Sequence, residues 1–118
     1  MNSYSLNAWL DDLQMSAQLG RLANLHSYDL NFFVEGCTFY ENNIPTVIIV
    51  DLMSLSKNDL NKLSNLPKAE LLTIIGYLPQ ITASQVKYFK DCGCHMVIGR
   101  NELLKNLYSI LKKVFHAN

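Results

Sequence analysis

The chain has 118 residues, which suits one domain over residues 1–118 with a single core and leaves no room for a second. Hydrophobic residues make up 49% of the sequence and charged residues 17%, which excludes an intrinsically disordered chain. Ten basic residues balance ten acidic ones, which argues against a surface built to hold nucleic acid or anionic lipid.

Strand and helix patterns alternate along the chain. In chain order the predicted segments are a strand at 5–10, a helix at 12–25, a strand at 30–34, a strand at 46–50, a helix at 57–66, a strand at 71–75, a helix at 84–92, a strand at 95–98 and a helix at 102–115. The segment between residues 34 and 45 has room for only a turn or two of helix.

Two apolar runs carry the strongest strand signal. Residues 46–50 form an unbroken β-branched run that ends at Asp51, which is typical of a strand buried on both faces in the middle of a parallel sheet. Residues 71–75 form the second run, which Gly76 and Pro79 are expected to stop. The other three strand signals are weaker.

The alternation of strands and helices predicts an α/β fold with a doubly wound parallel sheet and right-handed crossovers. Five strands in a chain of this length favour the flavodoxin-like order 2-1-3-4-5, here with a shortened second helix. In that order a ligand site lies where the first and third strands end.

Three carboxylates fall at this place. Asp11 and Asp12 follow the first predicted strand, and Asp51 follows the third. Clustered carboxylates on loops suit Mg²⁺, and a carboxylate beside bound Mg²⁺ can act as a nucleophile towards a phosphoryl group. The alternative is that Asp11 or Asp12 caps a helix and Asp51 merely ends a strand.

At these residues the sequence resembles the receiver domain of bacterial two-component response regulators, over nearly the whole chain. The motifs are the acidic pair in Leu10-Asp11-Asp12, the strand and turn at 47–53, and the small-residue turn at 91–94. The resemblance implies that Asp51 is the phosphoacceptor and that Asp12 is the principal Mg²⁺ ligand. Asp11 would support it, and Met53 would supply a main-chain carbonyl ligand.

The sequence departs from the family pattern where that pattern supplies the switch. Leu78 stands in place of a threonine or serine and has no hydroxyl for a phosphoryl oxygen, unless Thr82 or Ser84 reaches back. Arg100 replaces a lysine and could pair directly with Asp51, which would neutralise the acids without a metal. Val97 replaces the switch aromatic. The pattern resembles a degenerate receiver, or pseudo-receiver.

Apolar side chains on the last predicted helix indicate a contact surface. Leu104, Tyr108 and Phe115 lie beside the stripe that should cover the sheet, and Tyr88 on the preceding helix would extend them. In receiver domains the corresponding helices form the usual dimer or partner surface. The alternative is a core that is somewhat wider than this stripe.

Other sites have less support. The group Cys92-x-Cys94-His95 fits no paired zinc pattern, and the three cysteines do not form a disulfide framework. The five glycines form no phosphate-cradling loop. No stretch approaches the ~20 apolar residues of a membrane span, and the N-terminus does not resemble a signal peptide, so we expect a cytoplasmic protein.

Three hypotheses of function follow. The first is a stand-alone receiver-like signalling domain, not an enzyme, that works by protein–protein interaction without phosphorylation, through the helix surface or by docking a basic group in the acid pocket. The second is a single-domain response regulator that accepts phosphate on Asp51 with Mg²⁺. The third is a flavodoxin-like binder of another anion or metabolite. Expected partners are a histidine kinase, a phosphotransfer protein, an effector or a second copy of the chain, with no nucleic acid and no membrane.

Overall fold

Strands and helices alternate throughout the part of the chain that the computed structural model describes, which is residues 4–33, 44–65 and 71–116. The elements are β1 (Ser5–Trp9), α1 (Leu13–Leu25), β2 (Leu30–Phe33), β3 (Thr46–Asp51), α2 (Lys57–Ser64), β4 (Leu72–Leu78), α3 (Ala83–Asp91), β5 (Met96–Gly99) and α4 (Arg100–His116). The short helix expected between residues 34 and 45 falls almost entirely on positions outside the described residues.

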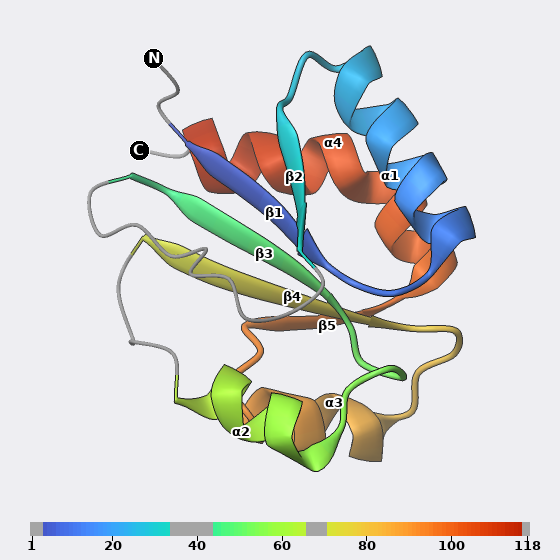
Figure 1. The fold of residues 1–118 in the computed structure, drawn as a ribbon, viewed down its shortest axis with the longest axis vertical. Coiled ribbons are helices and arrows are strands. Elements are labelled where there is room, and N and C mark those ends of the chain that lie inside the picture. The colour runs from blue at the N-terminus through green and yellow to red at the C-terminus, as the bar shows by residue number, and fades with distance from the viewer. Residues whose placement is uncertain (1–3, 34–43, 66–70, 117–118) are drawn as a thin grey trace.

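The five strands form one parallel sheet in the order β2-β1-β3-β4-β5 (Figure 1). This arrangement confirms the predicted flavodoxin-like topology. Every residue of β3 is buried, as its unbroken apolar run predicted. β3 lies at the centre of the sheet, so helices cover both of its faces.

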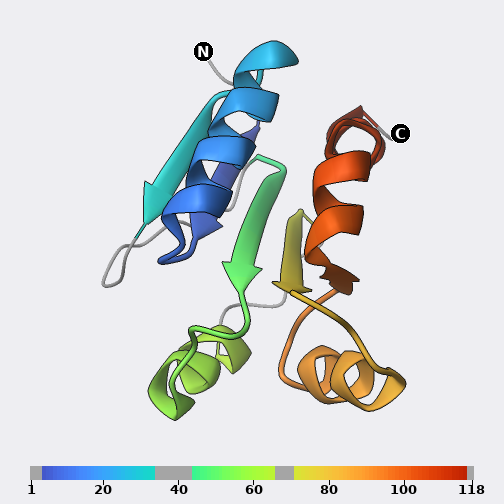
Figure 2. The same cartoon turned by 90° about the vertical axis from the view of Figure 1, so that its right-hand side faces the viewer.

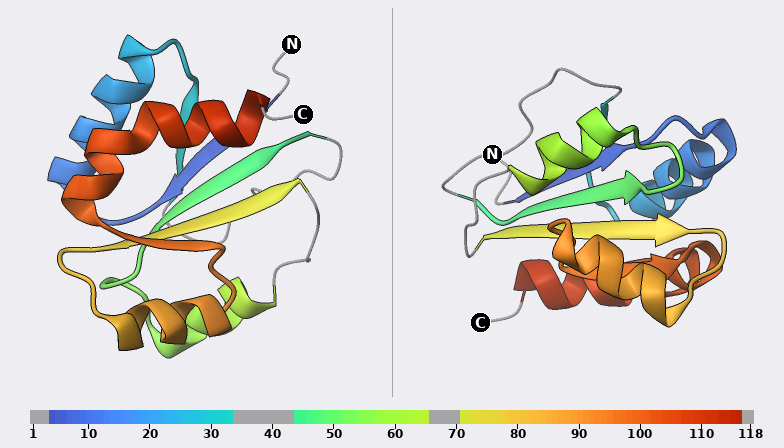
Figure 3. Two further views of the ribbon diagram at one scale, coloured as in Figure 1. Left: turned by 180° about the vertical axis from the view of Figure 1, so that it is seen from behind. Right: turned by 90° about the horizontal axis from the view of Figure 1, so that it is seen from below.

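The helices form two layers, one on each face of the sheet. α1 and α4 lie on one face, and α2 and α3 lie on the other (Figures 1 and 2). The views from behind and from below show the same division (Figure 3). Each layer closes its own core: Leu19 and Leu107 lie in the first, and Leu63 and Val97 in the second. No helix among the described residues is long and apolar enough to cross a membrane.

Side chains that satisfy free backbone N–H groups fix where the helices begin. Asp12 caps α1, and its carboxylate accepts a hydrogen bond from the Met15 N–H. Ser56 and Thr82 begin α2 and α3 with reciprocal capping boxes that also use Asp59 and Gln85. The local sequence therefore sets the start of each of these three helices.

β4 runs three residues beyond the predicted segment because Gly76 does not interrupt it. The Gly76 backbone pairs with Val50 on one side and Val97 on the other. A Cβ atom at position 76 would lie 2.5 Å from Leu52 Cδ1 and 2.8 Å from Leu52 Cγ, closer than packed atoms approach. Glycine is present here because the side chain of Leu52 fills the space above the strand.

Gly76→Ala should lower the free energy of unfolding by about 1–3 kcal/mol, because buried Leu52 must move out of a packed core. Gly20→Ala is the matched control, since a Cβ there meets only Phe32 Cζ at 3.9 Å inside α1. The control should raise stability by about 0.5–1 kcal/mol. Urea denaturation of both variants measures the difference, and equal effects would contradict this account of β4.

The His95 side chain completes the pairing between the ends of β4 and β5. Its ring Nδ1 accepts a hydrogen bond of 2.9 Å from the Ile74 N–H, and its backbone N–H donates to the Ile74 carbonyl oxygen at 2.8 Å. Only a neutral imidazole can accept at Nδ1. Burial also lowers the pKa of His95, because it disfavours the charged ring.

We expect the stability that His95 contributes to be present above its unfolded pKa and to be lost as the pH falls through its lower folded pKa. The midpoint of urea denaturation, followed from pH 7.5 to pH 5, measures this loss. His95→Asn is the control, because its amide oxygen can accept from the Ile74 N–H without titrating. Wild type and variant should diverge on acidification, and parallel curves would contradict the role assigned to His95.

Candidate functional site

The carboxyl ends of β1 and β3 lie side by side and bring the predicted acids to one edge of the sheet. The two strands pair in parallel, and Trp9 is the partner of Val50. Asp11 and Asp12 therefore leave β1 next to the point where Asp51 ends β3. This is the edge at which a parallel sheet of this order places a ligand site.

The carboxylate of Asp51 is held by its own loop. One oxygen, Oδ1, accepts a hydrogen bond of 3.1 Å from the Met53 N–H, and Oδ2 accepts one of 2.6 Å from the Ser54 hydroxyl. The residue is 6% exposed. These two hydrogen bonds from the loop offset the cost of burying the carboxylate.

Arg100 pairs with Asp12. Its Nη1 atom lies 3.6 Å from Asp12 Oδ2, and about a quarter of each side chain is exposed. The sequence argument had paired Arg100 with Asp51, but the guanidinium lies against the acid whose other oxygen caps α1. The ion pair joins the first residue of α4 to the cap of α1.

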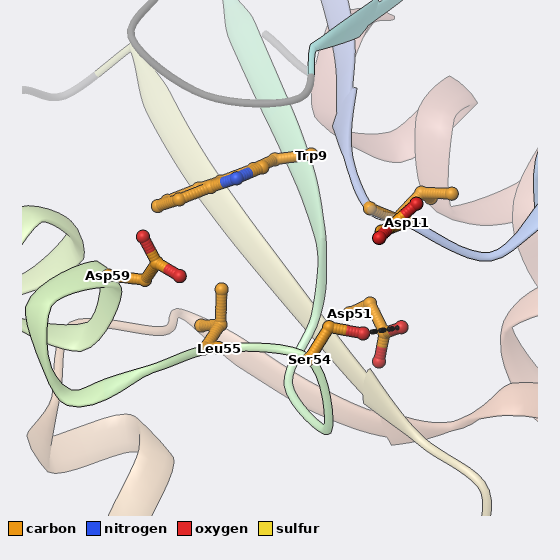
Figure 4. A pocket seen from close by; sticks show the side chains of 7 residues that line it. Trp9, Asp11, Asp51, Ser54, Leu55 and Asp59 are labelled. Atoms are coloured by element: carbon orange, nitrogen blue, oxygen red, sulfur yellow. Dashed lines mark hydrogen bonds between the residues drawn. The ribbon is translucent and has the colours of Figure 1, made fainter.

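The Asp11 side chain lines an open pocket together with Asp51, and Asp12 is not part of this lining. The pocket has a volume of about 280 Å³. Figure 4 shows the indole ring of Trp9 across the top of the pocket, Asp11 and Asp51 to its right and Asp59 to its left. The lining residues are Trp9, Leu10, Asp11, Asp51, Ser54, Leu55 and Asp59.

Two of the predicted magnesium ligands, Asp11 and Asp51, line one pocket, whereas Asp12 has other partners. Within residues 4–33, 44–65 and 71–116 no group of three or more histidine, cysteine, aspartate or glutamate side chains is arranged to hold a metal ion. Asp12 is engaged with Arg100 and the helix cap. The Met53 N–H donates to Asp51, which fixes the turn that also carries the Met53 carbonyl oxygen, the predicted ligand atom.

Tyr77 belongs to this site, although sequence reasoning missed it. It is the register partner of Asp51 on β4 and is 2% exposed. Its hydroxyl makes no hydrogen bond of acceptable geometry to a described residue. Burial raises the pKa of Tyr77, the negative charges of Asp51 and Asp12 raise it further, and Arg100 opposes them. The register of β3 and β4 is what places Tyr77 beside Asp51, and the sequence alone does not give this register.

Leu78 lies on the opposite side of the sheet from Tyr77. Successive residues of a strand point to opposite faces, and Leu78 is fully buried in the core under α2 and α3. Thr82, the alternative hydroxyl, caps α3 by accepting from the Gln85 N–H. Val97 also packs in the second core. The acid cluster thus has the phenol of Tyr77 beside it and no side chain from Leu78.

The four residues predicted to form a contact surface do not share one exposed face. Tyr108 stacks on His26 at 4.3 Å between ring centroids, Phe115 packs on Tyr4 at 4.7 Å, and Leu104 packs against the first core. Tyr88 lies in the other helix layer and is 55% exposed. A core wider than the apolar stripe, the alternative interpretation of the sequence, accounts for the packing of Leu104 and Phe115.

The cysteine and histidine group near β5 has structural roles. Cys94 is buried, which raises the pKa of its thiol to about 12 and keeps it protonated. His95 uses Nδ1 for the Ile74 N–H. Cys92 is a half-buried free thiol that ends α3. Cys37 lies outside the described residues.

Comparison with known proteins adds no family to this description. No family model, no curated protein and no solved structure matches the chain.

The unpartnered Tyr77 hydroxyl makes a measurable prediction. Tyr77→Phe should raise the free energy of unfolding by about 1–3 kcal/mol, because the variant no longer buries an unsatisfied polar group beside two carboxylates. The matched control is Tyr4→Phe, which removes a hydroxyl that accepts from the Asp29 N–H at 2.9 Å and should cost about 1 kcal/mol. Urea denaturation measures both, and a loss of stability in Tyr77→Phe would contradict the description of this hydroxyl.

Proposed function

We propose that the chain is a receiver-like signalling domain, related in kind to response regulators, that acts through protein–protein contact without phosphorylation of Asp51. The fold supports this proposal because its strand order brings the acids after β1 and β3 to one edge. In this proposal the partner is a protein of a two-component pathway or an effector, and the domain carries out no reaction of its own.

The observation that carries the proposal is the state of the Asp51 carboxylate. Both oxygens accept hydrogen bonds from the loop that follows β3, and the residue is almost fully buried. A carboxylate held in this way is fixed in orientation, and the two hydrogen bonds withdraw electron density from both oxygens and so weaken them as nucleophiles. The arrangement therefore stabilises the unmodified side chain.

The surroundings of Asp51 offer little to hold a phosphoryl group. Leu78 points into the other core, and the hydroxyl of Thr82 caps α3. Arg100 neutralises Asp12, the position at which a metal ligand was expected. These contacts favour a fixed acidic pocket over one that opens and closes with phosphorylation.

The proposal includes a cytoplasmic location. The free thiols of Cys92 and Cys94 suit a reducing compartment. We place the partner contact at the acid pocket, because Leu104 and Phe115 pack internally and leave Tyr108 as the exposed aromatic residue of the α4 group.

One observation favours the second candidate, a phosphorylatable domain. Asp51 and Asp11 line the same open pocket, so a small phosphodonor and a hydrated Mg²⁺ ion could approach them from solvent. In this case Asp51 would attack through a lone pair that its hydrogen bonds to Met53 and Ser54 leave open. The two candidates differ in one measurable step, which is the reaction of Asp51.

Titration with Mg²⁺ and then with beryllofluoride, a mimic of an aspartyl phosphate, separates the candidates. We expect the backbone amide resonances of Met53 and Ser54 to keep their positions, because the hydrogen bonds to Asp51 persist. Asp51→Asn is the control, since it retains one oxygen for the Met53 N–H and cannot accept phosphate. Saturable shifts in the wild type that vanish in Asp51→Asn would reject phosphorylation-independent function and establish the second candidate.

A further inference from the structure

We propose that the outer surface along the line where α1 meets α4 docks an acidic segment of a partner protein. This surface lies apart from the acid pocket, so the inference goes beyond the proposed function. Two properties carry it: basic charge on both helices, and exposed apolar and aromatic side chains between the charges. The surface, called the α1–α4 seam below, consists of Arg21, Leu25, His26, Lys105, Tyr108 and Lys112.

Two side-chain contacts join α1 and α4, which lie on the same face of the sheet (Figures 1 and 2). At the start of both helices, Arg100 Nη1 lies 3.6 Å from Asp12 Oδ2. At the end of α1, His26 stacks on Tyr108 with 4.3 Å between the ring centroids. The two helices therefore run in the same direction, and the seam between them extends along the whole of α1.

The helical period places basic side chains beside this seam. Arg21 and Leu25 are four residues apart and share one side of α1, and Leu25 directly precedes the residue that stacks on α4. Lys105, Tyr108 and Lys112 follow one another at intervals of three and four residues and share one side of α4. All five side chains are exposed. They therefore form one continuous outer surface.

The charge that the two helices bring to the seam is basic. α1 contains Arg21 and no acidic residue. The single acidic residue of α4 is Glu102, which lies in its first turn. After that turn α4 contains Lys105, Lys112 and Lys113 and no acid. Because exposed charges act over roughly 8–10 Å at moderate ionic strength, the partner surface that complements the seam is acidic.

Exposed non-polar surface lies between these charges. Leu25 is 70% exposed and Tyr108 is 43% exposed. The Tyr108 ring is held in place, because His26 stacks on it and Lys112 Nζ lies 5.9 Å from its centroid. A side chain fixed in this way loses little freedom when a partner binds, and tyrosine is enriched in protein interfaces. The partner segment therefore combines acidic residues with at least one apolar residue.

The same contacts favour a protein segment over a nucleic acid or a membrane. His26 covers one face of the Tyr108 ring, on which a base would stack. The ten acidic residues of the chain balance the ten basic ones, so a long polyanion that passes beyond the seam is repelled. A membrane surface takes up a wide apolar helix face, whereas the seam offers Leu25 and one aromatic ring. A short acidic segment contacts the seam alone.

Binding of a defined peptide tests the proposal. The probe is a short rhodamine-labelled peptide of alternating glutamate and leucine residues, and the control peptide has glutamine in place of every glutamate. Fluorescence anisotropy should show saturable binding of the acidic peptide and none of the neutral one. Raising the ionic strength should weaken the binding, because the charges involved are exposed. The amide resonances that shift on binding should belong to α1 and α4.

Charge-removal variants on both helices locate the surface. Lys105→Gln and Lys112→Gln should each weaken binding of the acidic peptide about two- to fivefold, as expected for exposed charge pairs. Arg21→Gln on α1 should act in the same direction. Lys87→Gln is the matched control, because this exposed lysine lies on α3 in the other helix layer and should leave binding unchanged. Urea denaturation of each variant checks that the fold is retained.

The outcomes decide this inference independently of the state of Asp51. Binding of the acidic peptide that the three seam variants weaken and Lys87→Gln does not would support it. No saturable binding, equal binding of the glutamine peptide, or an equal loss in Lys87→Gln would each overturn it. Tighter binding of a duplex DNA or of phosphatidylserine vesicles than of the peptide would also overturn it, because the seam would then serve another class of partner.

Discussion

The parallel pairing of β1 with β3 is the constraint on which the site depends. It places the residues that leave two strands, 40 positions apart in the sequence, against each other at one edge of the sheet. Three aspartates meet there, and their mutual repulsion must be relieved. The local structure around the edge shows three separate ways of doing so.

Each carboxylate is stabilised by a different kind of partner. Asp51 takes hydrogen bonds from its own loop, Asp12 takes a backbone N–H and a guanidinium, and Asp11 remains in contact with solvent in the pocket. This division leaves the negative charge concentrated on the open side, where Asp59 adds to it. An acidic and partly aromatic pocket is the result.

Much of the fold follows from local patterns, and much of the site does not. The apolar run of β3 is a local signal, and so is the cap at Asp12, which the sequence offered as one of two candidates with Asp11. The sequence also placed the acids at the correct edge, because the strand order predicts it. Which side chains touch depends on the strand register and on the side-chain rotamers, and the hydrophobic periodicity of the sequence predicts neither.

The residues that sequence analysis misassigned show this limit. Tyr77 and Leu78 are neighbours in the chain, and only the pairing of β4 with β3 decides which of them faces the acids. From the sequence, Arg100 could pair with Asp51 or with Asp12. In the structure it pairs with Asp12, whose other oxygen caps α1. Phe115 was expected in the contact surface, because the rings of Tyr4 and Tyr28 that pack against it lie far away in the sequence. Tyr108, by contrast, is 43% exposed.

The layer formed by α1 and α4 has a consequence for how the chain acquires its structure. Its core joins residues near both ends of the described chain, and the contact between Asp12 and Arg100 closes a loop of almost 90 residues. Such long-range closure is entropically costly and slow to form. During synthesis the face of β4 and β5 against which α4 packs stays exposed until that helix has left the ribosome. The emerging chain is therefore most open to aggregation, or to binding by a chaperone, just before α4 is completed.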